Sequence, residues 1–273
     1  IREVSAIMYI LRAFKSESVS HVYDKISPVD DLKIVRAELI LKDLETVQKK
    51  LDELKGHAKS GVDLEQKLQI EALEKVQNDL NNEIPAYVTK LSDEQKEYIS
   101  ELWLLTDKPA IYLVNIKGGV DEPELKGWMD ELKKIIPEEE RDFIMTVDCK
   151  MEGELIEVDS EEKNEMISMV DDYHGVQDII NLGYKRLDLI TFYTGNEKEA
   201  NAWTIKKGSN VKEAAGVIHS DLEQNFVAAE VVNIDKLVEL GGWVKVKEAG
   251  VLKNVSRDYI VEDGDYTVIL ATK

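Results

Sequence analysis

Two short apolar runs with one helix-length segment between them constrain the fold of this chain more than any other feature. The runs cover 108–115 and 143–147, and the segment at 125–136 has a helical pattern. A strand, a helix and a second strand with compact connections are typical of a right-handed βαβ unit, whose strands are parallel. The sequence therefore predicts an α/β protein with a parallel sheet.

A third apolar run, at 4–14, is rich in β-branched and aromatic residues. Continuous apolar runs are typical of strands that are buried on both faces, so we expect a buried strand here. The chain starts with Ile1 rather than Met and enters this run almost at once. We therefore expect the 273 residues to begin inside a domain of a longer protein.

Two long helical patterns lie between the first of these strands and the second. One begins near Ser27, with Asp30 or Asp31 available to cap it, and the other ends before Pro85. The segment 55–61 between them contains two glycines, which predicts an antiparallel hairpin. We expect a seam between the two helices that consists of Leu39, Leu44, Val47 and Leu51 on one side and Leu64, Leu68, Leu73 and Val76 on the other.

Further elements are predicted from capping patterns and from short alternating segments. Ser92 and Gln95 form a capping-box pattern for a third, shorter helix, and helices are expected at 160–170 and 175–183. From residue 189 onward only 211–217 is clearly helical, and short strands are predicted at 189–193, 202–205, 227–232, 259–261 and 266–271. This mixture indicates a small C-terminal α+β domain.

The net charge of −20 is distributed unevenly along the chain. Residues 189–273 carry 10 basic and 13 acidic side chains, which leaves −17 for residues 1–188. Phosphate backbones are repelled by such an acidic surface, so we expect no non-specific nucleic-acid binding by residues 1–188 and no sequence-specific DNA partner. The single Cys and the absence of an apolar run of membrane-spanning length favour a cytoplasmic protein with no membrane partner.

Few side chains are arranged for catalysis. Cys149 follows a strand and is expected to be a small apolar residue, and the acidic runs at 138–140 and 161–162 are expected to be solvated helix ends. The four histidines lack metal-ligand spacing, so we expect structural roles and no metal site for His21, His57, His174 and His219.

Asn115 is the most informative polar residue. It directly follows the apolar residues 111–114, at the carboxyl end of a predicted parallel strand, where ligands usually bind. Its side chain offers both a donor and an acceptor, as a purine edge requires. A turn residue that caps the loop at 116–119 is the alternative, and the residues alone leave both open.

Several stretches together carry a family resemblance: IREVSAI at 1–7, SPVDD at 27–31, LLTDKPAIYLVN at 104–115, AWTI at 202–205, AAGVIHSDLE at 214–223 and DYIVEDGD at 258–265. They are similar to the Obg-like ATPase family, also called YchF, a branch of the P-loop GTPase class. The first resembles the segment after switch II, the second the entry to a helical insert, and the third a strand that ends at the base-binding Asn. The last three resemble the TGS domain, a ubiquitin-like β-grasp module.

The resemblance implies the domain order, the activity and part of the site. It implies ATP hydrolysis in preference to GTP, with Mg²⁺, and association with ribosomes and translation. It places Asn115 and backbone groups of Ile116 and Lys117 against the purine base. The implied parts are a first G-domain segment at 1–33, a helical hairpin insert at 34–103, a second G-domain segment at 104–188 and a TGS domain at 189–273.

Departures from the family pattern concern the nucleotide site. The sequence contains no GxxxxGK[ST] motif and no recognisable switch II motif, so the phosphate cradle and the Mg²⁺ hydroxyl are missing. The family's NxxE is NIKG at 115–118, and DCKME at 148–152 replaces a loop of small residues. We therefore expect this chain alone neither to bind nor to hydrolyse ATP. We expect the chain to be the C-terminal part of an Obg-like ATPase. The alternative is a non-catalytic adaptor that docks on a ribosome or protein through its hairpin and TGS domain.

Any contact with RNA is expected in the nearly neutral C-terminal part. Ordinary solvated lysines are the alternative there. The candidate residues are Lys206, Lys207, Lys212, Lys245, Lys247, Lys253 and Arg257.

Overall fold

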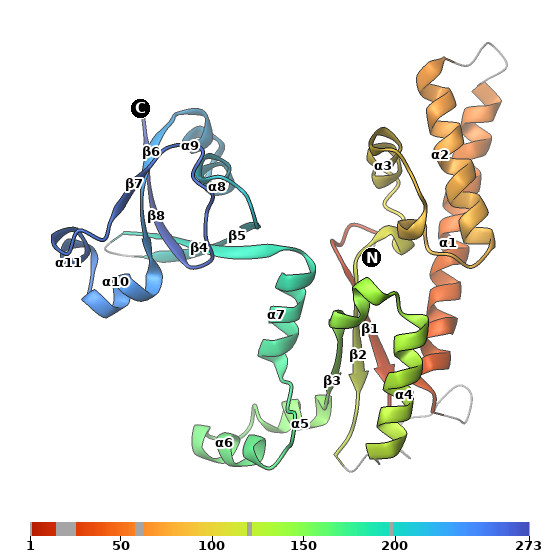
Figure 1. The fold of residues 1–273 in the computed structure, drawn as a ribbon, viewed down its shortest axis with the longest axis horizontal. Coiled ribbons are helices and arrows are strands. Elements are labelled where there is room, and N and C mark those ends of the chain that lie inside the picture. The colour runs from red at the N-terminus through yellow and green to blue at the C-terminus, as the bar shows by residue number, and fades with distance from the viewer. Residues whose placement is uncertain (1, 15–25, 58–62, 119–121, 197–198, 273) are drawn as a thin grey trace. The chain divides into compact units, whose positions relative to one another are not determined.

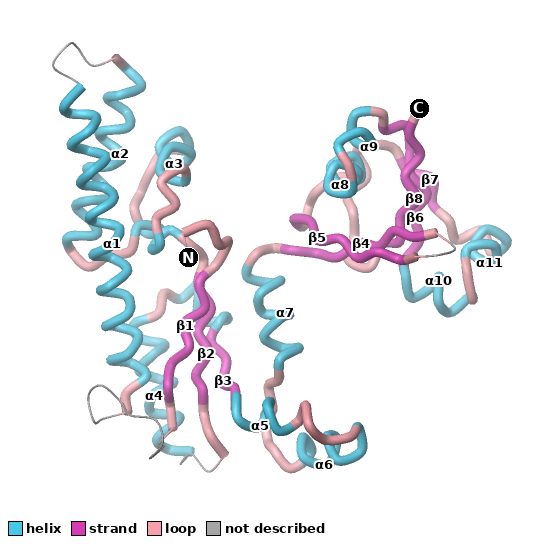
Figure 2. The backbone as a smooth tube through the Cα atoms, turned by 180° about the vertical axis from the view of Figure 1, so that it is seen from behind, coloured by secondary structure: helices cyan, strands magenta, loops and turns pink. Residues whose placement is uncertain are grey.

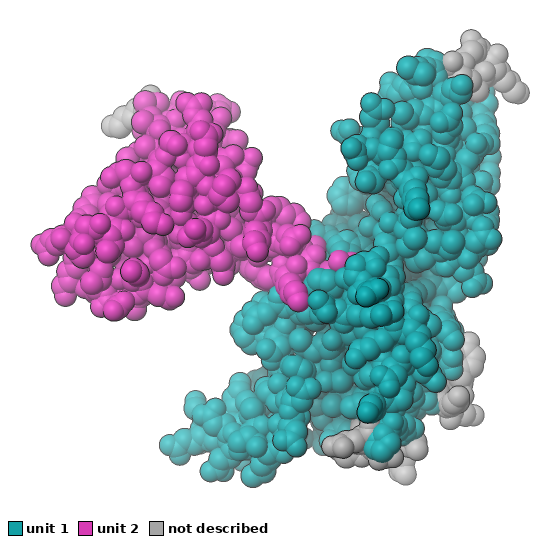
Figure 3. All heavy atoms as spheres, viewed as in Figure 1, with its two compact units in different colours: residues 1–183 teal, residues 184–273 magenta. Residues whose placement is uncertain are grey.

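The structure is a computed structural model, and it describes residues 2–14, 26–57, 63–118, 122–196 and 199–272. The chain forms two compact units, residues 1–183 and 184–273, which Figure 3 shows in two colours. Each unit has its own buried hydrophobic core. Within the described residues, no helix combines the length and the apolar character needed to cross a membrane.

A three-stranded parallel sheet lies at the centre of the N-terminal unit (Figure 1). Strands β1 (Ile7–Arg12), β2 (Ala110–Asn115) and β3 (Ile144–Val147) are ordered β1-β2-β3, and helix α4 (Glu122–Ile135) connects β2 to β3. β2 is buried along nearly all of its length because it is the central strand and hydrophobic clusters cover both of its faces. The predicted α/β class with a parallel sheet is confirmed.

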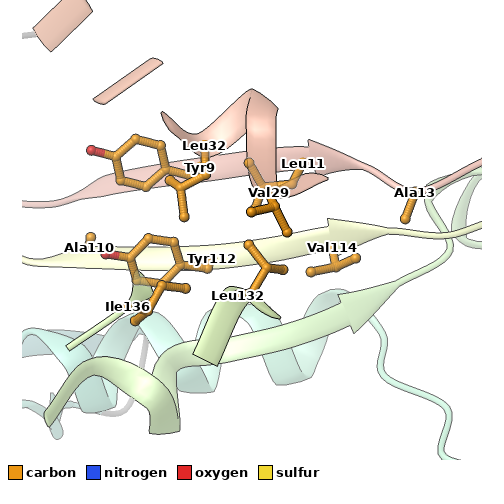
Figure 4. Close-up of a cluster of buried hydrophobic side chains, with 10 residues drawn as sticks. All are labelled: Tyr9, Leu11, Ala13, Val29, Leu32, Ala110, Tyr112, Val114, Leu132 and Ile136. Carbon is orange, nitrogen blue, oxygen red and sulfur yellow. The ribbon is translucent and has the colours of Figure 1, made fainter. Parts of the chain in front are cut away.

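Helices α1 (Pro28–His57) and α4 cover one face of this sheet. Figure 4 shows the side chains of β1 and β2 in two neighbouring rows on this face. Tyr9 and Tyr112 are stacked, with ring centroids 5.3 Å apart. Leu32 of α1 and Leu132 of α4 are fully buried in the same cluster, so α1 and α4 both contribute to one core.

Strand β1 lies at an edge of the sheet and buries only one of its faces. On the opposite face, Leu182 of helix α7 (Val176–Arg186) packs against β2 and β3. Met8 and Ile10 of β1 are outside that cluster and are 43% and 64% exposed. The prediction of a fully buried strand at 4–14 is therefore wrong, because the described hydrophobic cluster on this face joins α7 to β2 and β3 and does not include β1.

Helix α1 and helix α2 (Leu64–Asn81) form the predicted hairpin, and Figures 1 and 2 both show them side by side. Ser27 caps α1, since its hydroxyl accepts a 3.2 Å hydrogen bond from the backbone N–H of Asp30. The predicted caps Asp30 and Asp31 lie in the first turn instead, where their charge favours the positive end of the helix dipole. The glycine at 61 lies outside the described residues.

The seam of the hairpin is apolar and differs in part from the predicted one. Leu39 packs against the core of the sheet, Leu64 is 86% exposed, and Leu68 is outside the seam cluster. The reason is that the first turns of α1 pack against the sheet, whereas the later turns of α1 pack against α2. The residues packed in the seam include Ile40, Leu44, Val47, Leu51, Ala72, Leu73, Val76 and Leu80.

A short helix, α3 (Asp93–Ser100), follows the hairpin. The predicted capping box is confirmed: Ser92 Oγ accepts a hydrogen bond from the N–H of Gln95, and Gln95 Oε1 accepts one from the N–H of Ser92. Two 3-10 helices flank α3, namely η2 (Ala86–Val88) and η3 (Leu105–Asp107).

The acidic run at 138–140 is not solvated throughout, contrary to the prediction. It begins the 3-10 helix η4 (Glu138–Phe143), in which Glu140 is 2% exposed. The carboxylate of Glu140 accepts a 2.6 Å hydrogen bond from the hydroxyl of Tyr112, and Arg36 of α1 donates to the same hydroxyl at 2.7 Å. Burial raises the pKa of Tyr112, so this hydroxyl stays protonated and donates. The apolar surroundings come from segments distant in sequence.

Two short helices, α5 (Cys149–Glu154) and α6 (Ser160–Ser168), lie between β3 and α7. The predicted helices at 160–170 and 175–183 are present as α6 and α7. Helix α5 was not predicted, because six residues are too short to show a helical period.

The C-terminal unit contains a five-stranded mixed sheet in the order β5-β4-β8-β6-β7. β4 and β8 pair in parallel, and the other neighbours are antiparallel. Phe192 of β4 and Val211 are fully buried in its core. The strands are β4 (Leu189–Gly195), β5 (Ala200–Lys206), β6 (Phe226–Asn233), β7 (Lys253–Val255) and β8 (Asp265–Ala271).

This unit has more helices than the sequence predicted. The expected helix at 211–217 is present as α8 (Val211–Ile218). The prediction missed three helices of seven residues or fewer, α9 (Ser220–Gln224), α10 (Ile234–Leu240) and α11 (Trp243–Glu248). The strand predicted at 259–261 is wrong, since this segment forms only a single bridge between Asn210 and Ile260. The α+β class of the unit is confirmed.

Candidate functional site

The carboxyl ends of β2 and β3 lie side by side, because the two strands are parallel neighbours (Figure 1). β2 ends at Asn115, and β3 ends at Val147, directly before α5. Ligands of parallel α/β sheets usually bind at this edge. Asn115, Ile116 and Lys117, which were predicted to contact the base, therefore lie next to the loop at the end of β3.

Asn115 ties the two loops together. Its Oδ1 accepts a 3.3 Å hydrogen bond from the backbone N–H of Cys149. The N–H of Ile116 donates to the carbonyl of Val147 at 2.8 Å, so only the carbonyl of Ile116 is left to contact a ligand. Among the described residues, neither the Nδ2 amide of Asn115 nor the backbone of Lys117 has a hydrogen-bond partner. These groups are available to a ligand.

Asp148 is a member of this edge that the sequence analysis did not recognise. Its Oδ2 accepts a 2.8 Å hydrogen bond from the N–H of Gly118, and its Oδ1 accepts from Lys150 and Met151 at 3.0 Å each. It therefore caps α5 and also holds the loop after β2. An acidic residue directly after a strand and before a helix is the sequence signal for such a cap.

Cys149 is exposed and has a free thiol. Partial burial and the neighbouring carboxylates of Asp148 and Glu152 raise the pKa of this thiol. The thiolate is the nucleophilic form, so the thiol is not activated at neutral pH. Its exposure contradicts the expectation of a packed apolar residue.

The histidines that the structure describes have local contacts. His219 caps α9 by accepting a 3.1 Å hydrogen bond from the N–H of Asp221, and His174 lies 3.6 Å from the carboxylate of Asp172. His21 and the side chain of His57 lie outside the described residues. No group of three or more His, Cys, Asp and Glu side chains suited to a metal ion occurs among the residues that the structure describes.

Five of the seven candidate residues for RNA contact lie in two groups. Lys206, Lys207 and Lys212 are at the end of β5 and the start of α8, whereas Lys245 and Lys247 are on α11. β5 is one edge strand of the sheet, and α11 lies between β6 and the opposite edge strand β7 in the chain. The fold does not gather the five into one patch (Figure 1).

Two of these lysines have intramolecular partners. Lys206 Nζ donates a 2.7 Å hydrogen bond to the carbonyl of Leu187. Lys247 Nζ lies 3.4 Å from the carboxylate of Glu230 and 5.8 Å from the ring centroid of Trp243. Any RNA would have to compete with these contacts, and each of the two groups contains one such engaged lysine.

The sequence is similar to known proteins along nearly its whole length. The ribosome-binding ATPase YchF of Bacillus subtilis is 35% identical over 267 residues, which cover 97% of this chain and 72% of that protein. The chain belongs to the YchF family. The family model YchF-GTPase_C, described as "Protein of unknown function (DUF933)", matches residues 189–271, from β4 to β8.

Other YchF relatives extend the comparison to eukaryotes. Obg-like ATPase 1 of Oryza sativa is 32% identical over 97% of this chain and 67% of that protein. The structure of the Schizosaccharomyces pombe YchF GTPase matches with a TM-score of 0.79 and 32% identity over 98% of this chain and 73% of that one. The predicted family and fold class are thus confirmed, whereas the TGS assignment and the four domain boundaries stay predictions.

Proposed function

We propose that this YchF-family chain supplies the base-binding side of an adenine nucleotide site in a ribosome-associated, cytoplasmic ATPase. The observation that carries the proposal is the bridge between the loops after β2 and β3, in which Asn115 Oδ1 accepts from Cys149. This bridge holds the Asn115 amide at the sheet edge while its Nδ2 has no partner among the described residues. Asparagine can pair with the N6 and N7 positions of adenine through one donor and one acceptor.

The same edge favours adenine over guanine. Guanine carries an exocyclic amine at a ring position where adenine has none. A carboxylate with free lone pairs is the best hydrogen-bond acceptor for this amine. Position 118 is a glycine, and the nearby carboxylate of Asp148 already accepts three backbone hydrogen bonds. A guanine amine would therefore find a largely occupied acceptor.

The residues of this chain do not supply the part of the site that would bind the phosphates. The sequence has no GxxxxGK[ST] motif, and the described residues contain no candidate metal cluster, so the residues present do not fit Mg²⁺ or a triphosphate. This chain is therefore expected to release no phosphate from ATP by itself.

Calorimetry with ATP and GTP tests the base site. The 273-residue chain is expected to bind neither, whereas the same chain extended at Ile1 by a segment containing GxxxxGK[ST] binds ATP more tightly than GTP. In the extended protein, Asn115→Ala is expected to weaken ATP binding about tenfold, because it removes the hydrogen bonds between the Asn115 side-chain amide and the adenine base. Asn201→Ala, on β5, is the matched control.

Equal ATP binding by the Asn115→Ala protein and its parent would contradict the base assignment. Failure of the extended protein to bind either nucleotide would favour the adaptor alternative instead.

The ribosome part of the proposal rests on the names of the relatives, which are ribosome-binding ATPases. The charge reversals Lys206→Glu and Lys207→Glu together are expected to reduce co-sedimentation with ribosomes several-fold at physiological salt, because phosphate contacts dominate such binding. Lys133→Glu with Lys134→Glu, on α4, changes the charge equally and serves as the control. An equal loss with both pairs would show that only net charge matters.

A further inference from the structure

An open groove of about 540 Å³ lies between helices α2 and α3 in the N-terminal unit, a volume within the range of ligand-binding clefts. Figures 1 and 2 both show α3 beside α2. The apolar part of its lining consists of Leu64, Leu68 and Tyr98. Leu64 and Leu68 are the residues that the sequence analysis placed in the hairpin seam and that the structure leaves outside it.

The charged part of the lining is entirely acidic. Glu65 lies on α2, Glu94 and Glu97 lie on α3, and Glu101 is the residue that follows the last turn of α3. All four are exposed, and within the described residues none of them forms an ion pair. The groove therefore presents four carboxylates around an apolar floor and no basic residue, and Glu65 accepts a 3.5 Å hydrogen bond from Gln69 beside it.

Tyr98 lines the groove and also packs against the core of the hairpin. Its hydroxyl is shielded from solvent and has no hydrogen-bond partner among the described residues. Burial raises the pKa of Tyr98, and the carboxylates of Glu101 and Glu53 raise it further, so the hydroxyl lies in a negative electrostatic potential. A buried polar group without a partner is unusual in folded proteins.

We propose that this groove binds a lysine- or arginine-rich segment of a partner protein. Long basic side chains have apolar stems and charged ends, so their stems can lie on Leu64, Leu68 and Tyr98 while the ends reach the glutamates. Four carboxylates repel RNA phosphates and a membrane of anionic lipids, and a purely apolar segment would leave the glutamates without partners. A basic peptide is the occupant that satisfies both kinds of lining.

Fluorescence anisotropy with a labelled octapeptide of alternating lysine and leucine tests the proposal at physiological salt. Glu97→Gln with Glu101→Gln is expected to weaken binding up to about tenfold, which is the combined effect of losing two exposed ion pairs. Leu64→Ser is expected to weaken it about threefold, because part of a leucine contact is lost. Leu64 is largely exposed, so this change leaves folding intact.

The control is Glu157→Gln with Glu165→Gln, two exposed glutamates outside the groove. This pair removes the same net charge and is expected to leave the affinity unchanged. Equal weakening by both pairs would show that the overall charge of −20 attracts the peptide, and would overturn the groove as the site.

The probe peptide has its own control, an octapeptide of alternating lysine and serine, which is expected to bind more weakly. Equal affinity of the two peptides would overturn the role of the apolar floor, and displacement of the peptide by an oligouridylate would overturn the assignment to a protein partner. The measurement requires no nucleotide and no ribosome. Its failure is therefore distinguishable from failure of the proposed ATPase function.

Discussion

Replacing Asp43 by alanine is expected to lower the free energy of unfolding of the N-terminal unit by about 3–5 kcal/mol. Asp43 is 0% exposed, and its carboxylate accepts hydrogen bonds from the N–H of Leu105 at 2.9 Å, the N–H of Thr106 at 2.7 Å and the hydroxyl of Thr106 at 2.8 Å. Alanine leaves these buried donors without an acceptor. Urea unfolding followed by hydrogen exchange of peptides from residues 1–183 measures the change.

Asp52→Ala is the matched control for this prediction. Asp52 is also on α1, but its hydrogen bond from Gln48 is exposed, so its loss is expected to cost no more than about 0.5 kcal/mol. Asp43→Asn keeps one acceptor and is expected to fall between the two. A loss below about 1 kcal/mol for Asp43→Ala would mean that water replaces the carboxylate.

Phe192→Ala is expected to destabilise the C-terminal unit by about 3–5 kcal/mol. Phe192 is 0% exposed and lies at the centre of the sheet core, where alanine would leave a cavity. Hydrogen exchange along β4, β6 and β8 is expected to accelerate, while protection of residues 1–183 is unchanged, because each unit has its own core.

Val227→Ala, on β6, is the control for the C-terminal unit, since Val227 is exposed. It is expected to change the free energy of unfolding by less than about 0.5 kcal/mol. Simultaneous loss of protection in both units on Phe192→Ala would contradict the expectation that they unfold separately.

Local pattern in the sequence determined the main elements of this protein. The apolar runs before Asn115 and Val147, with one helix between them, led to the parallel sheet and to its carboxyl edge as the candidate site. Capping chemistry at Ser92 and Gln95 placed the start of α3 correctly. These features are local, because capping hydrogen bonds and the periods of helices and strands depend on residues that are close together in the sequence.

Tertiary structure decided which faces of those elements are covered. Glu140 belongs to a run that looks solvated, yet it is buried because Arg36 and Tyr112, distant in sequence, surround it. Ile10 is apolar and exposed because, among the residues that the structure describes, it is outside the cluster that α7 forms with β2 and β3. Leu64 has the spacing of a seam residue and instead lines the groove beside α3. Burial depends on segments far apart in the chain, and no local period contains that information.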